Sequence, residues 1–503
     1  HRTIGLTVKP QRVVFWITAF FVAGISIGLS FRESVSFNRG SSMDQFFQYL
    51  RDEYVDTLDI PRLQQESMDY ILSRLDPHSV LIPVEDEQEI AERMQGSFSG
   101  VGVEFTIYED TLVFVHIMEG GPAELYGLIA GDRIYAIDGD TIVGPDLTND
   151  VVTSKIKGPV NTYVLFSIMR DGMPINAAVQ RDFIPLKSVS GTRMYGPMGY
   201  TKIERFAEST TEELEAALAK LSEQNMRGLI LDLRDNPGGY LHEAVDIGDL
   251  FLDEGKVIVS TKYKDGRTQT AEATGGDDYE DLPIHIILNG QSASASEVLS
   301  GALQDHDRAT IYGSTSFGKG LVQEDKILPD GSTVRLTVAY YYTPSGRSIQ
   351  KPYKGADLPG EMEGMIFQSD SGKVLRTIGG IEPDVEVVND TTRSYFWGFS
   401  FGTIDDFAFQ WVDDHRESIV LWEYERYFDM VIVNDGMIHE FFDYGGYGLM
   451  LEDLPSDQLS DLELILKAAI AKNIWGFDAY TAMLLDEDPI LKEVVKNSTG
   501  TLE

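Results

Sequence analysis

The segment from residue 284 to residue 323 constrains the fold more than any other part of the sequence. An apolar run at 284–288 ends at Asn289-Gly290, which is the pattern of a buried strand stopped by a turn. Small residues follow at 292–296, and apolar residues then recur at helical spacing, which predicts a helix that begins near Ala295. A serine at such a turn lies at the positive end of the helix dipole, beside backbone N–H groups without partners. This position can hold a nucleophile and stabilise an oxyanion.

A glycine-flanked lysine, Lys319, begins the next predicted element. The residues from Lys319 onward turn at Asp330-Gly331 and continue as a second extended run, which predicts a hairpin. Side chains alternate along a strand, so Gln323 is expected on the same side as Lys319 and can orient its amine. A lysine can accept a proton only when it is neutral, and its ordinary pKa is about 10.4. Burial without a counter-charge lowers this pKa, and residues 316–322 contain no acid.

The strings SASASE at 292–297 and FGKGLVQ at 317–323 together resemble the signature of the carboxyl-terminal processing proteases, also called tail-specific proteases. The resemblance implies that Ser294 is the nucleophile, that Lys319 is the general base and that Gln323 supports the lysine. The alternative interpretation is a helix start rich in small residues, followed by a glycine-rich turn with a solvated lysine. We expect a serine-type endopeptidase.

A second turn lies between a predicted buried strand at 228–233 and a helix, and it contains Asn236-Pro237-Gly238-Gly239. The alternation of strands and helices in this region predicts an α/β protease body with a mostly parallel sheet, at residues 190–388. The family resemblance implies an oxyanion site made by the backbone N–H of Ala295 together with that of Gly238 or Gly239. Glycine allows the backbone to approach a substrate closely. By itself the turn could also be a simple entry to a helix.

Residues 96–184 contain short predicted strands and many glycines, including the string GLIAGDRIYAIDG at 127–139. This region resembles a PDZ domain, placed as a β module between N-terminal helices and the protease body. Such domains bind extended peptide tails by strand addition, and a glycine-rich loop holds the terminal carboxylate. The resemblance assigns that loop to Gly100, Val101, Gly102 and Val103. The alternative is a purely structural β module.

An uncharged apolar run at 13–31 follows the basic residues Arg2, Lys9 and Arg12. At about 1.5 Å per helical residue it can cross a hydrocarbon core of about 30 Å, which predicts one transmembrane helix. The positive-inside rule then places residues 1–12 in the cytoplasm. With the family resemblance, we expect a single-pass protein of the bacterial cytoplasmic (inner) membrane, with its catalytic part on the periplasmic or extracytoplasmic side. A cleaved signal peptide is the alternative.

The remaining regions are predicted from periodicity and turn signals. Helical spacing predicts an N-terminal helical region at 42–95, interrupted at Asp76-Pro77-His78-Ser79, where His78 is expected to be a structural turn residue. A long loop at 353–375 could lie over the active site or decorate the surface. Residues 389–503 are predicted to form a helical C-terminal extension with a largely aromatic core. The N-terminal helices could pair two copies of the chain, and the sequence does not decide whether the protein is a homo-oligomer.

Composition excludes several classes of function. The 503 residues carry a formal net charge of −40, which argues against a nucleic-acid partner. The absence of cysteine excludes disulfides and thiolate metal sites, and no His-Glu-x-x-His string is present. We therefore expect no metal and no cofactor.

The expected partners are the C-terminal tails of envelope proteins. Two other functions remain open from the sequence. One is a Ser-His-Asp hydrolase that uses His242, because His306 would lie about three helical turns from Ser294. The other is a catalytically inactive, membrane-anchored PDZ scaffold.

Overall fold

The computed structural model describes residues 42–276, 278–353, 365–376, 379–387, 399–419, 421–428, 430 and 432–499. The chain divides into two compact units, His1–Leu72 and Ser73–Glu503. In the first unit, helices α2 (Ser42–Glu53) and α3 (Ile60–Leu72) contact each other, and the helices predicted in this region are confirmed.

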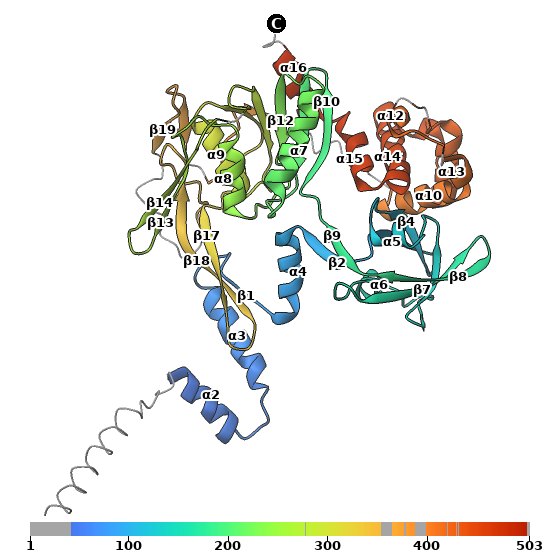
Figure 1. The fold of residues 1–503 in the computed structure, drawn as a ribbon, viewed down its shortest axis with the longest axis horizontal. Helices are drawn as coiled ribbons and strands as arrows, with labels where there is room; N and C mark the ends of the chain where they lie inside the picture. Colours follow the sequence, from blue (N-terminus) through green and yellow to red (C-terminus); the bar gives the residue numbers. More distant parts are fainter. Residues whose placement is uncertain are drawn as a thin grey trace, which may run out of the picture. The chain divides into compact units, whose positions relative to one another are not determined.

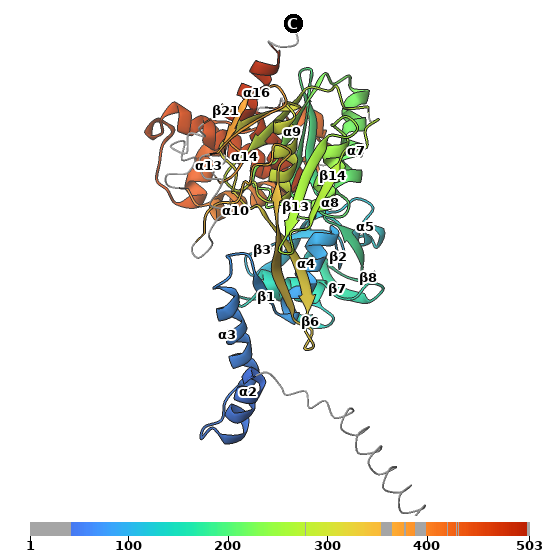
Figure 2. The same ribbon diagram turned by 90° about the vertical axis from the view of Figure 1, so that its left-hand side faces the viewer.

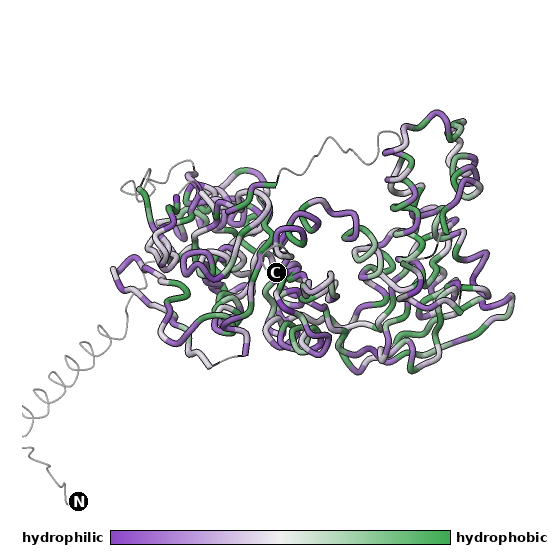
Figure 3. Tube along the Cα trace, turned by 90° about the horizontal axis from the view of Figure 1, so that it is seen from above, coloured by the Kyte–Doolittle hydropathy of each residue, from purple (hydrophilic) through white to green (hydrophobic). Residues whose placement is uncertain are grey.

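The predicted membrane anchor at 13–31 and the cytoplasmic tail at 1–12 lie outside the described residues. Among the helices that the structure describes, none combines the length and the apolar character needed to cross a membrane. Hydrophobic and hydrophilic residues are interspersed along the coloured part of the trace (Figure 3).

A six-stranded sheet forms the centre of the region predicted to be the protease body. Its strand order is β10 (Val189–Tyr195), β11 (Met198–Ile203), β12 (Gly228–Asp232), β15 (Ile284–Leu288), β16 (Ala309–Gly313) and β21 (Val385–Glu386). The β10–β11 pair is antiparallel, whereas the pairs from β11 to β21 are parallel. The sheet is therefore mixed, and the predicted parallel arrangement holds for all of its strand pairs except the first.

Helices cover both faces of this sheet (Figures 1 and 2). One face packs against α7 (Thr210–Glu223), α8 (Leu241–Asp249) and α9 (Ala295–Asp305), and the other packs against α15 (Phe477–Leu485) and α16 (Pro489–Thr499). Successive strand residues alternate between these two cores, because side chains of a strand point to opposite faces. In β12, for example, Leu229 and Leu231 join the first core and Ile230 joins the second.

A second, fully antiparallel sheet, which the predicted fold class did not include, joins four strands of the protease body to one strand from the N-terminal region. Its strands are β1 (Val80–Ile82), β13 (Val257–Tyr263), β14 (Thr268–Glu272), β17 (Leu321–Ile327) and β18 (Thr333–Tyr342). The predicted hairpin is the β17–β18 pair and is confirmed. The rest of this sheet joins strands that are distant in the sequence, and local periodicity does not reveal such pairing.

The PDZ-like module has its own antiparallel sheet and its own hydrophobic core. It contains β3 (Val103–Tyr108), β4 (Thr111–Ile117), β5 (Arg133–Ile137), β6 (Asp140–Thr141), β7 (Tyr163–Arg170), β8 (Met173–Gln180), α5 (Pro122–Leu125) and α6 (Asn149–Ile156). The ends of the module meet in a two-stranded ribbon, β2 (Ser97–Gly100) with β9 (Asp182–Pro185), and α4 (Val84–Gln95) precedes it.

The described part of the C-terminal extension is helical, as predicted. Its helices before α15 are α10 (Phe401–Asp414), α11 (Arg416–Ile419), α12 (Tyr424–Tyr427), α13 (Asp435–Gly445) and α14 (Ser456–Trp475), which enclose a core rich in aromatic residues. An ion pair of 2.6 Å joins Asp413 to Arg133 of the PDZ-like module. The extension therefore contacts that module and, through α15 and α16, also the central sheet.

The long loop predicted at 353–375 contains a short hairpin, β19 (Ile366–Gln368) with β20 (Val374–Arg376). Residues 354–364 lie outside the described part of the chain, and a position over the active site stays a prediction.

Candidate active site

Ser294 lies where the loop after β15 enters α9, as the strand–turn–helix pattern predicts. Its backbone has φ 56° and ψ −114°, a conformation that residues other than glycine rarely adopt. Such strain is found preferentially at functional sites, where the surrounding structure must maintain it. Here the Ser294 N–H donates to Glu297 Oε2 at 2.9 Å. Ser294 and Glu297 occupy the two ends of a capping box, in which the Ser294 oxygen can only accept, so over the described residues the hydroxyl proton of Ser294 is donated to no partner.

Glu297 joins the serine loop to the lysine loop. It is completely buried, and besides the Ser294 N–H it accepts hydrogen bonds from Ser316 Oγ (2.5 Å), Gly318 N (2.7 Å) and Lys319 N (2.8 Å). Burial raises the pKa of its carboxyl group, although these hydrogen bonds oppose the shift. Sequence analysis missed this role, but Ser294-x-x-Glu297 has the spacing of a helix capping box, which is a detectable signal.

Lys319 and Gln323 are in contact, as predicted. The Lys319 Nζ donates to Gln323 Oε1 at 2.9 Å, and Gln323 Nε2 donates to the His78 carbonyl oxygen at 2.5 Å. Strand alternation alone does not explain the contact, because Lys319 precedes β17 and the pairing register shifts between Val322 and Gln323. His78 contributes its backbone here, while its ring lies edge-on to Phe317 with centroids 6.3 Å apart. This agrees with its predicted role as a turn residue.

The pKa of Lys319 lies below its ordinary value. Burial is the main cause, because desolvation disfavours the ammonium form, and the positive charge of Arg335 adds to the effect. Asp76 and Glu297 act in the opposite direction. The sequence showed no acid near Lys319, and the structure adds these two acids from distant positions. Within the described residues Lys319 still forms no ion pair, and the net shift of its pKa remains downward.

Tyr341 holds the serine and lysine loops side by side. Its buried hydroxyl contacts the carbonyl oxygen of Ser294 at 3.1 Å and also that of Lys319. In the described part of the chain, no hydrogen bond joins Ser294 Oγ directly to Lys319 Nζ. Catalytic hydrogen bonds are often loose without substrate and tighten when it binds, so the arrangement is compatible with proton transfer.

Gly238 lies against the serine. A Cβ at this position would be 2.7 Å from the Ser294 Cβ and 3.0 Å from the Ala295 nitrogen. Its φ of 99° also favours glycine. However, the Gly238 N–H donates to Asn236 Oδ1 at 2.9 Å, and the Asn236 amide in turn donates to the Ile203 carbonyl at 2.8 Å.

The other two predicted donors have no such partner. Over the ranges that the structure describes, the N–H groups of Ala295 and Gly239 donate no hydrogen bond. Gly239 also approaches the backbone closely, since a Cβ there would lie 2.0 Å from the Phe206 carbonyl oxygen. Among the described residues, Ala295 and Gly239 thus have N–H groups without an acceptor. Gly238 can lie against Ser294 because it has no side chain. Their oxyanion role stays a prediction.

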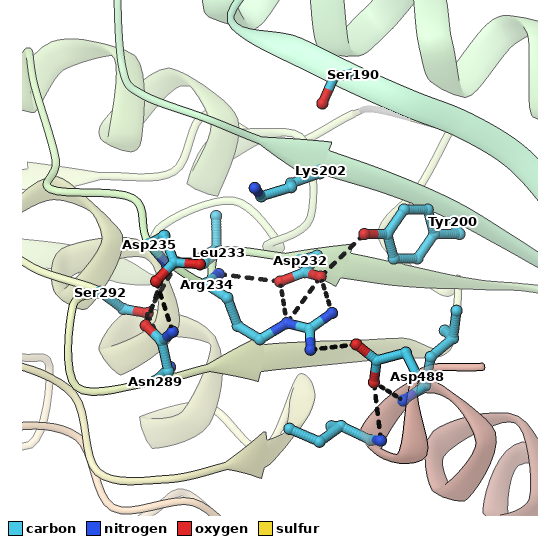
Figure 4. Close-up of polar contacts among 12 residues, drawn as sticks. Ser190, Tyr200, Lys202, Asp232, Leu233, Arg234, Asp235, Asn289, Ser292 and Asp488 are labelled. Carbon is cyan, nitrogen blue, oxygen red and sulfur yellow. Dashed lines mark hydrogen bonds and ion pairs between the residues drawn. The ribbon is translucent and has the colours of Figure 1, made fainter. Parts of the chain in front are cut away.

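Side-chain hydrogen bonds tie the glycine turn to the serine loop. Figure 4 shows Asn289 paired with Asp235: the Asp235 N–H donates to Asn289 Oδ1 at 3.0 Å, and Asn289 Nδ2 donates to Asp235 Oδ1 at 2.9 Å. Ser292 Oγ donates to the Leu233 carbonyl at 2.8 Å, and Ser296 Oγ donates to the Asn236 carbonyl at 3.1 Å. The serines on either side of Ser294 therefore have structural partners.

The two histidines of the alternative hydrolase mechanism have other contacts. His306 is bonded through its ring nitrogens to Asp370 Oδ2 (2.9 Å) and the Val257 carbonyl (2.7 Å). The His242 side chain is 58% exposed and lies 3.5 Å from Glu243. In the described part of the chain neither histidine is hydrogen-bonded to Ser294, so the structure offers no support for a Ser-His-Asp triad.

The predicted tail-binding loop, Gly100 to Val103, joins β2 to β3 in the PDZ-like module. The carbonyls of Val101 and Gly102 accept hydrogen bonds from the N–H groups of Ala123 and Met118, whereas the N–H groups of Val101 and Gly102 find no acceptor among the described residues. A cavity of about 340 Å³, partly lined by Met118, lies beside this loop. This geometry could receive a carboxylate, a role that stays a prediction.

No group of three or more His, Asp or Glu residues suited to a metal ion is found over the described ranges.

Comparison with known proteins places the chain in a family. The model of peptidase family S41 matches residues 197–358, and that of a family of unknown function, DUF8443, matches residues 399–476. A carboxy-terminal-processing protease of Bartonella bacilliformis is 36% identical over 347 residues, which cover 66% of this chain and 79% of the relative. A probable CtpA-like serine protease of Staphylococcus aureus strain MSSA476 is 32% identical over 361 residues, 70% of this chain and 71% of the relative.

Two solved structures are also similar. The photosystem II D1 C-terminal processing protease is 28% identical, covers 70% of this chain and 88% of its own, and has a TM-score of 0.38. The PDZ domain of a carboxy-terminal protease from Vibrio cholerae is 29% identical, covers 18% of this chain and 99% of its own, and has a TM-score of 0.17.

A strained serine and a half-buried lysine, whose backbone N–H groups both donate to Glu297, define a candidate serine peptidase site. With the sequence matches, the chain belongs to peptidase family S41, among the carboxy-terminal-processing proteases, and is a serine-type peptidase.

Proposed function

We propose that the chain is a membrane-anchored envelope endopeptidase that cleaves proteins near their C-terminal tails with a Ser294–Lys319 dyad. One observation carries this proposal: the strained Ser294, whose hydroxyl proton has no acceptor among the described residues, and the half-buried Lys319, with its lowered pKa, are tied together through Glu297. A lowered lysine pKa increases the fraction of free amine that is available to take the serine proton, which nucleophilic catalysis without histidine requires.

In the proposed reaction, Lys319 Nζ takes the proton of Ser294 Oγ while Oγ attacks the substrate carbonyl carbon. The N–H groups of Ala295 and Gly239 stabilise the negative oxygen of the tetrahedral intermediate. The protonated Lys319 then gives its proton to the leaving amine, and an acyl-enzyme remains. Lys319 removes a proton from the water that hydrolyses this ester, and it returns the proton to Ser294. Gln323 orients the amine throughout through its 2.9 Å contact.

The PDZ-like module is proposed to capture the substrate's terminal carboxylate through the free N–H groups of Val101 and Gly102. Two synthetic peptides of one sequence, ending in a free acid or an amide, test this. We expect the acid form to be cleaved faster and to bind the Ser294→Ala protein more tightly, because only the acid carries the charge that the loop would hold. Binding of the two peptides is compared by calorimetry. Equal cleavage and equal binding would remove this role from Gly100 to Val103.

The membrane anchor is proposed from the apolar run at 13–31 and its basic flank. In fractionated bacterial cells, we expect the full chain in the membrane fraction after a high-salt wash, and a chain beginning at residue 42 in the soluble fraction. Mass spectrometry of the N-terminus separates the alternatives, because an intact run 13–31 is expected for an anchor. A mature protein that begins shortly after residue 31 would instead establish a cleaved signal peptide.

A further inference from the structure

Arg234 connects the glycine turn to the C-terminal extension. It follows β12 and immediately precedes the turn at 235–239. Its guanidinium pairs with Asp232 through Nε and Nη2, the shortest distance being 2.5 Å, and its Nη1 pairs with Asp488 Oδ2, also at 2.5 Å (Figure 4). The Arg234 and Asp488 side chains are only 12% and 15% exposed, so this pair is shielded from most screening by solvent.

Asp488 immediately precedes α16 and uses its two carboxylate oxygens for different purposes. The Oδ1 atom accepts hydrogen bonds from the N–H groups of Ile490 (2.8 Å) and Leu491 (2.9 Å), which caps the helix. The Oδ2 atom pairs with Arg234. The apolar side chains of Ile490 and Leu491 then pack in the core on the second face of the central sheet. Asp488 therefore has a fixed position from which it can restrain Arg234.

The turn that follows Arg234 depends on such restraints. Asp235, Gly238 and Gly239 all have positive φ, and Gly238 and Gly239 contribute no side chains to hold the loop. On one side the turn is tied to the serine loop through Asn289. On the other side, the fully buried Asp232, which also accepts from the Tyr200 hydroxyl at 2.9 Å, fixes Arg234 together with Asp488.

We propose that Asp488 is a positioning residue for catalysis: through Arg234, helix α16 of the C-terminal extension fixes the glycine turn whose Gly239 N–H receives the oxyanion. The inference rests on the proposed function, because it assumes that the turn acts on the tetrahedral intermediate. Electrostatic stabilisation by backbone donors requires accurate placement, and an error of about 1 Å can cost about 10²-fold in rate. The residue does not touch the substrate in this proposal.

The test compares Asp488→Ser with Asp486→Asn in the full chain. Serine can still cap α16 but is too short to pair with Arg234. Asp486 is the matched control, because it also joins the extension to the protease body, through Arg193 at 3.2 Å, but on β10, at the antiparallel end of the central sheet. We expect Asp488→Ser to lower kcat for a short peptide about 10- to 100-fold with little change in KM. Asp486→Asn should retain the parent kcat, and Asp488→Glu should recover part of the loss.

A peptide aldehyde provides the second measurement, because its adduct with a serine nucleophile places an oxyanion in the site. Its inhibition constant should rise in Asp488→Ser by a factor similar to the loss of kcat. Binding of the uncleaved peptide, measured in the Ser294→Ala background, should not change. Thermal unfolding shows whether each variant is folded at the assay temperature.

Three outcomes would overturn the positioning role: an unchanged kcat in Asp488→Ser, an equal loss in Asp486→Asn, or a loss that appears in peptide binding instead of aldehyde binding. Should Asp488→Ser be unfolded, Asp488→Asn replaces it, because it keeps the cap and removes only the charge. Failure of the proposed function looks different. In that case the Ser294→Ala protein itself cleaves peptides, whatever the Asp488 variants do.

Discussion

The Ser294→Ala variant is expected to lose peptide-bond cleavage by several orders of magnitude while remaining folded. Removal of the nucleophile in a serine peptidase costs about 10⁶-fold in kcat, because the other groups of the site act only together with it. Alanine shares the Cβ of serine, so the strain at φ 56° is unchanged. The Ser294 N–H to Glu297 bond is also retained. Hydrolysis of a fluorogenic peptide and thermal unfolding are the measurements.

Ser300→Ala is the matched control on the same helix. Ser300 is buried in α9, and its hydroxyl donates only to the Ser296 carbonyl, at 2.7 Å. Its replacement should leave most activity. An equal loss in both variants would mean that damage to α9, not loss of a nucleophile, explains the result. Ser292 and Ser296 are poorer controls, because their hydroxyls tie the serine loop to the glycine turn. Their alanine variants should show intermediate activity.

Lys319→Arg is expected to reduce activity by several orders of magnitude, because arginine keeps the positive charge and much of the bulk but cannot act as a base. Arginine can still donate to Gln323, so the change mainly removes the capacity to accept a proton. Steady-state hydrolysis of the same fluorogenic peptide is the measurement. If Lys319 served only to hold its loop, the substitution would be mild, and near-normal activity would refute the proposed dyad.

The pH dependence provides an independent check on the same residue. The free amine is the active form, so kcat/KM should rise with pH through the pKa of Lys319 in the folded enzyme. That pKa lies below its ordinary value, chiefly through burial and further through Arg335. Arg335→Met removes a positive charge and leaves its partner Asp325 unpaired. Both changes favour the ammonium form of Lys319, so the rise of kcat/KM should occur at higher pH. If the rise occurs at the same pH as in the parent enzyme, a group other than Lys319 controls it.

Much of the candidate site could be predicted because its signals are local. The apolar run, the turn, the small residues and the helical spacing around Ser294 are short-range patterns, and they predict a strand–turn–helix unit that the structure contains. Strand alternation predicted that Gln323 could orient the Lys319 amine, and the structure shows this contact although Lys319 precedes β17. The family resemblance, carried by these same strings, agrees with the matches to peptidase family S41.

The partners of these residues were decided only by the tertiary structure. Gln323 donates to the carbonyl of His78, and Tyr341 bridges the serine and lysine loops. The second antiparallel sheet pairs β1, which precedes the PDZ-like module, with β18 of the protease body. Periodicity shows which face of an element is apolar, but it does not show which distant element covers that face.

The C-terminal extension illustrates the same division. Its helical character follows from the spacing of its apolar residues, which is a property of a short segment. The sequence does not show that α15 and α16 complete the second face of the central sheet, or that Asp488 meets Arg234. These contacts arise because β12 is apolar on both faces and must be covered on each, and only the folded chain brings the C-terminal helices to that surface.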